Sequence, residues 1–207
     1  MKPSRPAAFV VALAAAFAAS GARAGLPDIG KPAPALAAHD EDGKPIDLRQ
    51  FRGRPVVLEW TNNGCPFVRH VYNSGVMQGL QRRAAAQGVV WLTVISSAPG
   101  KQGYLAPQQV AQWKTATGAA SADVLLDPSG AVGRAYGARA TPTLYIVDPK
   151  GVLIYMGGID DHPSTDPADA KRAKNYVALA LDDLKAGRPI ADKVTPPYGC
   201  SVKYSDD

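Results

Sequence analysis

Two cysteines are the side chains of this sequence best suited to covalent chemistry, and they lie far apart in the chain. Cys65 stands in the stretch Thr61-Asn-Asn-Gly-Cys-Pro-Phe-Val-Arg-His70, between an Asn/Gly turn and the first turn of an expected helix, and Cys200 lies near the C-terminus. Thiol chemistry needs the thiolate, and the free N–H groups and dipole of a helix N-terminus favour that anion. Because Pro66 suits the first helical position, the sequence predicts an acidic, nucleophilic thiol at Cys65.

Four side chains lie close to Cys65 in the sequence, and only some of them are candidates to act at its sulfur. Arg69 lies one helical turn away, where it is either a solvated charge or a cation that turns back and attracts the thiolate. Trp60 is expected in the core or in the wall of the site. Glu59 is expected as a carboxylate at the rim or, if buried, as a proton acceptor. His70 points away from Cys65 and is expected at the surface or rim rather than as a partner of the sulfur.

The elements that must position Cys65 are a buried strand, a turn and a helix. Val56–Thr61 is largely apolar, as in a strand that is buried on both faces, and a helix is predicted over 66–86. Gly75 and Gly79 weaken this helix or mark a bend within it. The other expected elements are a hairpin over 36–48, a strand over 89–95, a helix over 107–117, a strand over 123–126, a short helix ending at 136, a hairpin over 143–156 and a last helix from about 165–167 to Gly187. Strands separated by helices predict an α/β fold with a central mixed sheet.

The N-terminus predicts export. Lys2 and Arg5 precede an apolar run that ends at Ala22-Arg23-Ala24, a small-x-small pattern typical of signal-peptide cleavage. The run is too short to span a bilayer, so residues 1–24 are interpreted as a signal peptide rather than a retained anchor. We therefore expect one periplasmic domain over 25–207, with 188–207 as an extended tail, in a compartment where thiols oxidise.

Charge and histidine spacing argue against two other classes of function. The formal net charge is +5, of which three positive charges belong to the predicted signal peptide, so about +2 remains on the mature domain. No basic patch interleaved with aromatics accompanies it, so no nucleic-acid partner is expected. Two cysteines and three unclustered histidines do not form a structural zinc site, and we expect neither a metal nor a cofactor.

Two further motifs resemble a known family. The segments ATPTLYIVD and DPKGVLIY, placed after the strand-turn-Cys-Pro-helix motif, are similar to the thioredoxin-like superfamily, in particular to its exported AhpC/TSA peroxiredoxin-like and TlpA-like branch. The resemblance implies a thioredoxin-like fold with a cis Thr141–Pro142 bond packed against Cys65. It also implies that the backbone of Thr141 is available to pair with a substrate chain. We expect Pro142 beside it, and Pro66, Arg69 and Trp60 near Cys65, to contribute to substrate binding as well.

The motifs depart from the family in two places. Val68 occupies the position of the second cysteine of Cys-x-x-Cys, so only Cys200 can resolve a mixed disulfide within the chain. Peroxiredoxins carry Thr or Ser three residues before the reactive cysteine, and Asn62 occupies that position here. A tail cysteine together with a single active-site cysteine resembles a peroxiredoxin-like subgroup in which the tail folds back.

Three functions remain open from the sequence. The leading hypothesis is an exported thiol-disulfide oxidoreductase in which Cys65 is the nucleophile and Cys200 resolves the adduct. The second is an antioxidant thiol peroxidase that uses the same pair. The third is a non-catalytic thioredoxin-like module with a structural disulfide, which holds a partner or a copper ion. The partners expected for the enzyme are a thiol- or disulfide-bearing protein, a small thiol reductant or a peroxide, with no membrane anchor on the mature chain.

Overall fold

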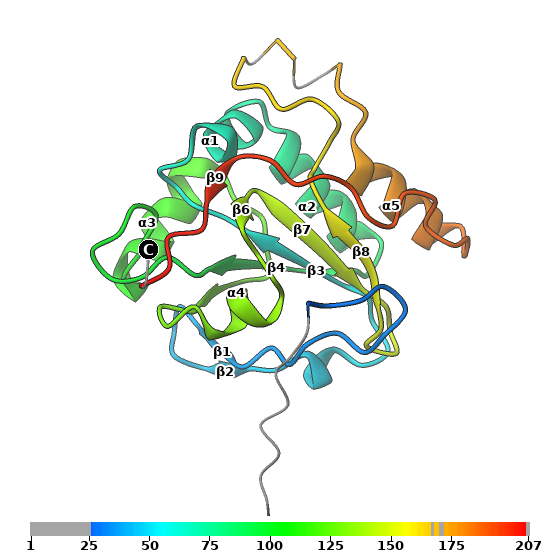
Figure 1. The fold of residues 1–207 in the computed structure, drawn as a ribbon, viewed down its shortest axis with the longest axis horizontal. Coiled ribbons are helices and arrows are strands. Elements are labelled where there is room, and N and C mark those ends of the chain that lie inside the picture. Colours follow the sequence, from blue (N-terminus) through cyan, green and yellow to red (C-terminus); the bar gives the residue numbers. More distant parts are fainter. Residues whose placement is uncertain (1–25, 167, 170–171, 206–207) are drawn as a thin grey trace, which may run out of the picture.

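A central seven-stranded mixed sheet organises the protein (Figure 1). The computed structural model describes residues 26–166, 168–169 and 172–205. The strand order is β2-β1-β5-β4-β3-β7-β8, with β3, β4 and β5 parallel and the outer pairs antiparallel, which confirms the predicted α/β class. The strands are β1 (Ala38–Asp40), β2 (Pro45–Ile46), β3 (Val56–Trp60), β4 (Val90–Ile95), β5 (Asp123–Leu126), β7 (Thr143–Val147) and β8 (Leu153–Gly157).

Helices cover both faces of the sheet, and β3 is buried between them. Val57 points into the cluster that contains side chains of α1 (Pro66–Asn73), α2 (Val76–Ala86), α3 (Pro107–Thr117) and α5 (Tyr176–Lys185). Leu58 points into the opposite cluster, which contains the 3-10 turn η1 (Leu48–Phe51) and α4 (Ala131–Ala135). Burying each such side chain contributes about 1.5–3 kcal/mol, so both faces hold β3 in place. This strand leads directly to Cys65.

The helix predicted over 66–86 is two helices. Gly75 has φ +78°, a left-handed conformation that favours glycine, and it separates α1 from α2. The N–H of Ser74 still donates to the carbonyl of His70, so α1 ends in an ordinary helical turn. The bend suspected at Gly75 is therefore a complete break, and the other glycine, Gly79, lies inside α2.

The last helix begins later than the sequence predicted. Asn175 caps α5 by accepting a hydrogen bond from the N–H of Ala178 at 2.7 Å. The predicted start near Thr165 is wrong, because residues 172–175 are not helical, while Pro167 lies outside the described residues. The helix itself is confirmed, and Val177, Ala180 and Leu181, which lie on one face of it, are buried.

The C-terminal tail runs back across the sheet edge after α5 (Figure 1). Met156 of β8 donates to the carbonyl of Lys193 and accepts from the N–H of Thr195, at 3.0 and 3.1 Å. The tail then forms β9 (Cys200–Ser201), which pairs antiparallel with β6 (Ala140–Thr141) in a separate two-stranded sheet. The tail is thus a packed part of the domain in this structure.

The predicted signal peptide, 1–24, lies outside the described residues. None of the helices in the described part of the chain is both long enough and apolar enough to cross a membrane.

Candidate active site around Cys65

Cys65 lies where β3 gives way to α1, at the N-cap of the helix. The turn before it is held by its own backbone and side chains: the Cys65 N–H donates to the carbonyl of Asn62 at 3.0 Å, and the Gly64 N–H donates to Asn62 Oδ1 at 2.8 Å. Pro66 follows at the first helical position, as predicted. The short turn therefore fixes the sulfur against the free N–H groups of α1.

The cis Thr141–Pro142 peptide lies beside the sulfur. Cys65 Sγ is 3.3 Å from the carbonyl oxygen of Thr141, to which the neutral thiol donates. Thr141, Pro142 and Cys65 are all buried. The residues are 76 positions apart in the chain, so the sheet brings them together through the pairing of β3 with β7.

Cys200 reaches Cys65 from the tail of the same chain. In the β6–β9 ladder Thr141 is directly opposite Cys200, and the Thr141 hydroxyl donates to the Cys200 carbonyl at 3.4 Å. The Cys200 thiol acts on Cys65 by lowering its pKa, and both cysteines are free rather than bridged. The site is therefore a dithiol assembled from residues at opposite ends of the domain.

The pKa of the Cys65 thiol is lowered in spite of its burial. Burial alone raises the pKa, because it penalises the charged sulfur. The Cys200 thiol, the N–H groups of Val68 and Cys200 and the Thr141 side chain outweigh this cost by favouring the thiolate. The helix N-terminus thus acts as the sequence predicted, but the tail supplies part of the effect, which the sequence did not indicate.

The pKa of Cys200 moves the other way, to about 11. Burial is the first cause, and the hydrogen bond to Cys65 and the negative charge of its thiolate are the next. Lys203 and Arg69 oppose this rise. The two thiols are therefore shifted in opposite directions, so that Cys65 loses its proton at a lower pH than Cys200 does.

Arg69 turns back toward the site. Its guanidinium donates to the carbonyl of Gly64 at 3.0 Å while the side chain remains exposed. Of the two interpretations left open by the sequence, the geometry favours the one in which Arg69 faces the turn. Its positive charge acts on Cys200, whose pKa it lowers.

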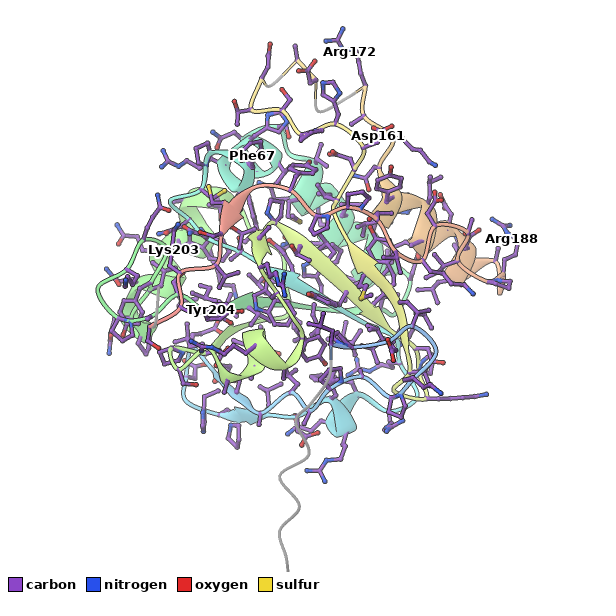
Figure 2. The ribbon with its side chains drawn as sticks, viewed as in Figure 1. Phe67, Asp161, Arg172, Arg188, Lys203 and Tyr204 are labelled. Carbon is purple, nitrogen blue, oxygen red and sulfur yellow. The ribbon has the colours of Figure 1, made fainter. Side chains whose placement is uncertain are left out.

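Two residues anchor the tail on the far side of Cys200. The hydroxyl of Tyr198 donates to Asp160 Oδ1 at 2.7 Å, and its ring meets that of Phe67 edge-on, with ring centroids 5.7 Å apart. Figure 2 shows Phe67 where α1 meets the tail, with Lys203 and Tyr204 further along it. Asp160, to which the sequence assigned no role, is a buried acceptor for the tail.

Three of the residues expected to bind substrate, Trp60, Thr141 and Pro142, are buried and not accessible to a substrate. Trp60 is fully buried on the opposite face of β3, where its Nε1 donates to Ser96 Oγ at 3.0 Å and its ring packs against Tyr136. The backbone of Thr141, expected to be free for a substrate chain, already pairs with Cys200. Because the tail occupies this edge, the accessible site consists of Cys200, Arg69 and the exposed Pro66.

Glu59 is a buried carboxyl group rather than a rim carboxylate. Its Oε1 accepts from the Tyr72 hydroxyl at 2.9 Å, and its Oε2 accepts from Trp91 Nε1 at 2.8 Å. Gln81 and Thr93 donate to the same Oε2, at 3.1 and 3.3 Å. Burial raises the pKa of Glu59 although these donors oppose the rise. The signal for this burial was present in the sequence, because a strand covered on both faces has no rim.

Replacing Glu59 with glutamine is expected to change how stability depends on pH. A raised pKa means that the folded protein holds this proton more tightly than the unfolded chain does. The contribution of protonated Glu59 to the free energy of unfolding is therefore present below about pH 4.5 and is lost as pH rises through the folded pKa. A folded pKa one pH unit above the unfolded one corresponds to about 1.4 kcal/mol. The advantage of wild type over Glu59→Gln in urea unfolding should therefore shrink from pH 4 to 8. An advantage that stays constant across this range would contradict the assignment.

Glu41 provides a matched control for that experiment. Partial burial opposes ionisation of Glu41, but the N–H of Val124 and the Lys114 ammonium lower its pKa overall. The contribution of ionised Glu41 to the free energy of unfolding is therefore present above about pH 4.5 and is lost as pH falls. Glu41→Gln should give a pH trend of the opposite sign.

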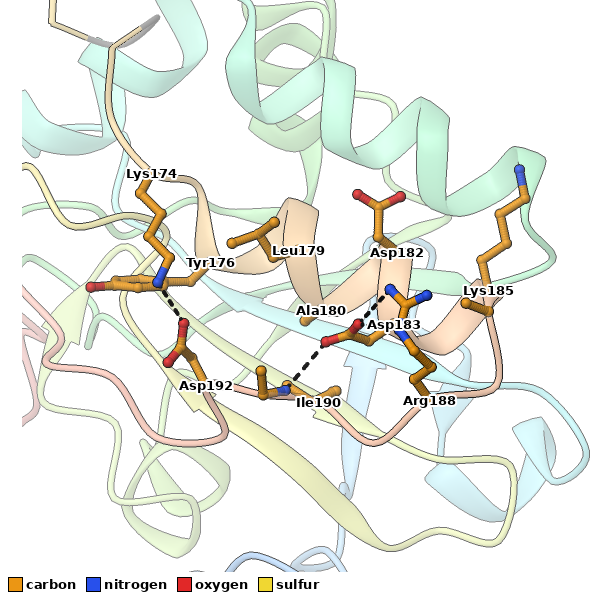
Figure 3. Close-up of a pocket in the computed structure, with 12 residues that line it drawn as sticks. Lys174, Tyr176, Leu179, Ala180, Asp182, Asp183, Lys185, Arg188, Ile190 and Asp192 are labelled. Atoms are coloured by element: carbon orange, nitrogen blue, oxygen red, sulfur yellow. Dashed lines mark hydrogen bonds and ion pairs between the residues drawn. The ribbon is translucent and has the colours of Figure 1, made fainter.

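A separate hollow of about 710 Å³ lies between α5 and the segment that follows it (Figure 3). Ion pairs Lys174–Asp192 and Arg188–Asp183, both 2.8 Å, stand in its wall. Neither cysteine lines it, so it is not part of the site around Cys65. In the part of the chain that the structure describes, no three His, Cys, Asp or Glu side chains are grouped to suit a metal ion.

Solved structures share this fold over most of its length. An uncharacterized conserved protein from Geobacillus kaustophilus is 28% identical, with a TM-score of 0.75, and the match covers 87% of this chain and 94% of that one. A hypothetical protein from Sinorhizobium meliloti 1021 is 23% identical, with a TM-score of 0.73, over 88% and 98% of the two chains. A putative thiol:disulfide interchange protein DsbE from Chlorobium tepidum is 23% identical, with a TM-score of 0.53, over 75% and 98%. The last two show the fold alone.

The sequence comparison identifies the family. No protein with a curated description matches the chain. The model of the AhpC/TSA family matches residues 29–156, a segment that includes Cys65, Thr141 and Pro142 but ends before the tail that carries Cys200. The chain therefore belongs to the AhpC/TSA family, with a thioredoxin-like fold, and is a thiol-dependent oxidoreductase.

Proposed function

We propose that this protein is an exported thiol-disulfide oxidoreductase that cycles between the Cys65/Cys200 dithiol and an internal Cys65–Cys200 disulfide. The observation that carries the proposal is the convergence of two cysteines of one chain on Thr141, whose carbonyl oxygen lies 3.3 Å from Cys65 Sγ and whose backbone is paired with Cys200 in the β6–β9 ladder. Cys65 stands at a helix N-terminus, and its pKa is lowered. A thiolate and a second sulfur in contact with it are what disulfide exchange requires. Membership of the AhpC/TSA family, whose model matches a segment that includes Cys65, supports thiol chemistry at this residue.

The reaction has two exchange steps. The Cys65 thiolate attacks one sulfur of a substrate disulfide; that S–S bond breaks, a mixed disulfide with Cys65 forms and one substrate thiolate leaves. Cys200 then attacks Cys65 Sγ, transfers its proton to the second departing substrate thiolate and closes the Cys65–Cys200 bond. The substrate gains two electrons and the cysteine pair loses two. The reverse sequence oxidises a substrate dithiol.

The proposed location follows from the N-terminal pattern. Residues 1–24 are proposed to be a cleaved signal peptide, and 25–207 the exported domain with its tail over 188–207. In an oxidising compartment the internal disulfide persists until a reductant opens it. Lys2, Arg5 and the Ala22-Arg23-Ala24 pattern support this assignment.

A single-turnover reaction tests the proposal. Reduced protein is mixed with glutathione disulfide, quenched with N-ethylmaleimide and analysed by intact mass and peptide mapping. We expect a product lighter by two hydrogen atoms in which Cys65 is bonded to Cys200. In urea, where the fold no longer holds the sulfurs together, the two cysteines should instead collect separate glutathione adducts. Separate adducts on the folded protein, or no reaction, would overturn the proposal.

Membership of the AhpC/TSA family supports a thiol peroxidase as the second candidate function. In that case the peroxide oxidises Cys65 to a sulfenic acid. The Cys200 thiol then condenses with this sulfenic acid, which forms the same Cys65–Cys200 disulfide and releases water. The turn residue Asn62 is already used, because its Oδ1 accepts from Gly64 and its Nδ2 donates to the carbonyl of Gln102. One N–H of Asn62 Nδ2 is thus committed to Gln102, and this position carries no hydroxyl of the kind that peroxiredoxins place there. Hydrogen peroxide in place of glutathione disulfide, with a Cys65→Ser control, separates the two functions.

A further inference from the structure

The tail strand β9 takes the place that a bound polypeptide takes when it adds a strand to a sheet edge. Such binding uses main-chain hydrogen bonds along an exposed strand, and here the strand is β6. Thr141 is opposite Cys200 and Ala140 is opposite Ser201 in an antiparallel register. The pairing continues beyond the strand, because the Val202 N–H donates to the carbonyl of Arg139 at 3.0 Å.

The contact is closest at Gly199. This residue has φ +119°, and a Cβ built on it would lie 2.0 Å from the carbonyl oxygen of Thr141. Backbone atoms cannot yield as a flexible side chain does, so any side chain at 199 would push β9 away from β6. Tyr198 secures the tail on one side of this contact, through Asp160 and Phe67. On the other side, the N–H of Ala98 donates to the carbonyl of Lys203 at 2.8 Å.

The docked strand has two consequences for access to the sulfur atoms. Cys65 is 0% exposed, so a bulky disulfide does not reach it while β9 is in place. The other sulfur of the site, Cys200, is partly exposed, but its pKa of about 11 makes it a poor nucleophile at neutral pH. A polypeptide substrate must therefore displace the whole of β9, whereas a small disulfide needs only a local opening beside Cys200.

We propose that β9 is a built-in competitor for polypeptide substrates, so that the docked protein selects low-molecular-weight disulfides and discriminates against disulfides carried by polypeptides. This inference rests on the proposed exchange chemistry of Cys65 and Cys200. Gly199 is then the residue that determines specificity, because it alone lets the tail lie against Thr141. The substrate class narrows from any disulfide to a small one.

The experiment compares two substrates in single turnovers of the reduced protein. The small probe is glutathione disulfide, the polypeptide probe is insulin, and the product measured for both is the internal Cys65–Cys200 disulfide. For wild type we expect the rate constant with insulin to be smaller than the rate constant with glutathione disulfide, so that the ratio of the first to the second is below one. Gly199→Ala should raise this ratio at least about tenfold, which corresponds to about 1.4 kcal/mol of lost docking free energy.

A matched control measures the effect on the ratio of replacing a glycine of positive φ that does not contact β6. Gly187 also has a positive φ, +65°, but a Cβ on it meets nothing within 4 Å, so Gly187→Ala should leave the ratio unchanged. If Gly199→Ala does not fold, Tyr198→Ala weakens the other anchor and should raise the same ratio. An unchanged ratio in the folded tail variant, or a wild type that prefers insulin, would overturn the inference. Absence of any internal disulfide with glutathione disulfide would instead overturn the proposed function.

Discussion

Replacing Cys200 with alanine is expected to stop turnover while the first exchange at Cys65 continues. The Cys65 thiolate can still attack a disulfide, but no second sulfur is present to release the adduct, so a mixed disulfide with Cys65 should accumulate. Steady-state reduction of glutathione disulfide should fall by about a thousandfold, the scale expected when one member of a covalent catalytic pair is lost. Intact mass of the trapped adduct and the steady-state rate measure the two effects.

A serine and an alanine variant of Cys200 separate its role in resolving the adduct from its effect on the pKa of Cys65. Cys200→Ser removes the resolving sulfur but keeps a hydroxyl that can donate to the Cys65 thiolate, whereas Cys200→Ala removes the donor as well. Both should lose turnover, but only the alanine variant should raise the pKa of Cys65, measured from the pH dependence of iodoacetamide alkylation. Cys65→Ser should react with neither disulfide nor iodoacetamide at the active-site position. Full turnover in Cys200→Ala would contradict the cycle and leave Cys200 a structural residue.

The neighbourhood of Cys65 was predictable because its determinants are local. A buried strand, an Asn/Gly turn and Pro66 are adjacent in sequence, and each has one conformation that suits it. The core face of α5 was predictable for the same reason, since an apolar stripe of helical spacing needs no distant partner. The start of that helix was not, because a second capping signal near residue 165 competes with the one at Asn175 that the fold uses.

The environment of Cys200 depends on contacts that sequence spacing does not reveal. The β6–β9 register joins residues 59 positions apart and requires the left-handed conformation of Gly199 against Thr141. Glycine in a Pro-rich tail is equally typical of a loose segment, so the sequence alone left Thr141 open to a substrate chain. The burial of Glu59 followed from its strand, but its hydrogen-bond donors did not, because they come from α1, α2 and β4 and meet only in the folded core. The expectation that His70 lies at the surface or rim was wrong, because His70 is buried.

The oxidised protein is expected to be much more stable than the reduced one. The Cys65–Cys200 bond closes a loop of more than 100 residues, which in the chain-entropy model destabilises the unfolded chain by roughly 4–5 kcal/mol. In the folded state the bond requires little new order, because β9 is already paired with β6 and places Cys200 opposite Thr141, whose carbonyl oxygen lies 3.3 Å from Cys65 Sγ. For a domain of this size each kcal/mol moves the thermal midpoint by about 2–4 °C, so oxidation should raise it by roughly 10–20 °C.

Thermal melts of the oxidised and reduced forms measure this difference directly, and Cys200→Ala, which cannot form the bond, should melt at the same temperature with and without oxidant. The size of the shift in the thermal midpoint also shows whether the disulfide fits the docked position of the tail. A full shift means that the disulfide fits the docked tail and that a reductant must overcome its stability. A midpoint that does not rise on oxidation would mean that the bond strains β9 away from Thr141, because strain in the native state cancels the gain from the unfolded chain. Such a strained bond would be readily reduced, and the tail would then leave β6 in each cycle.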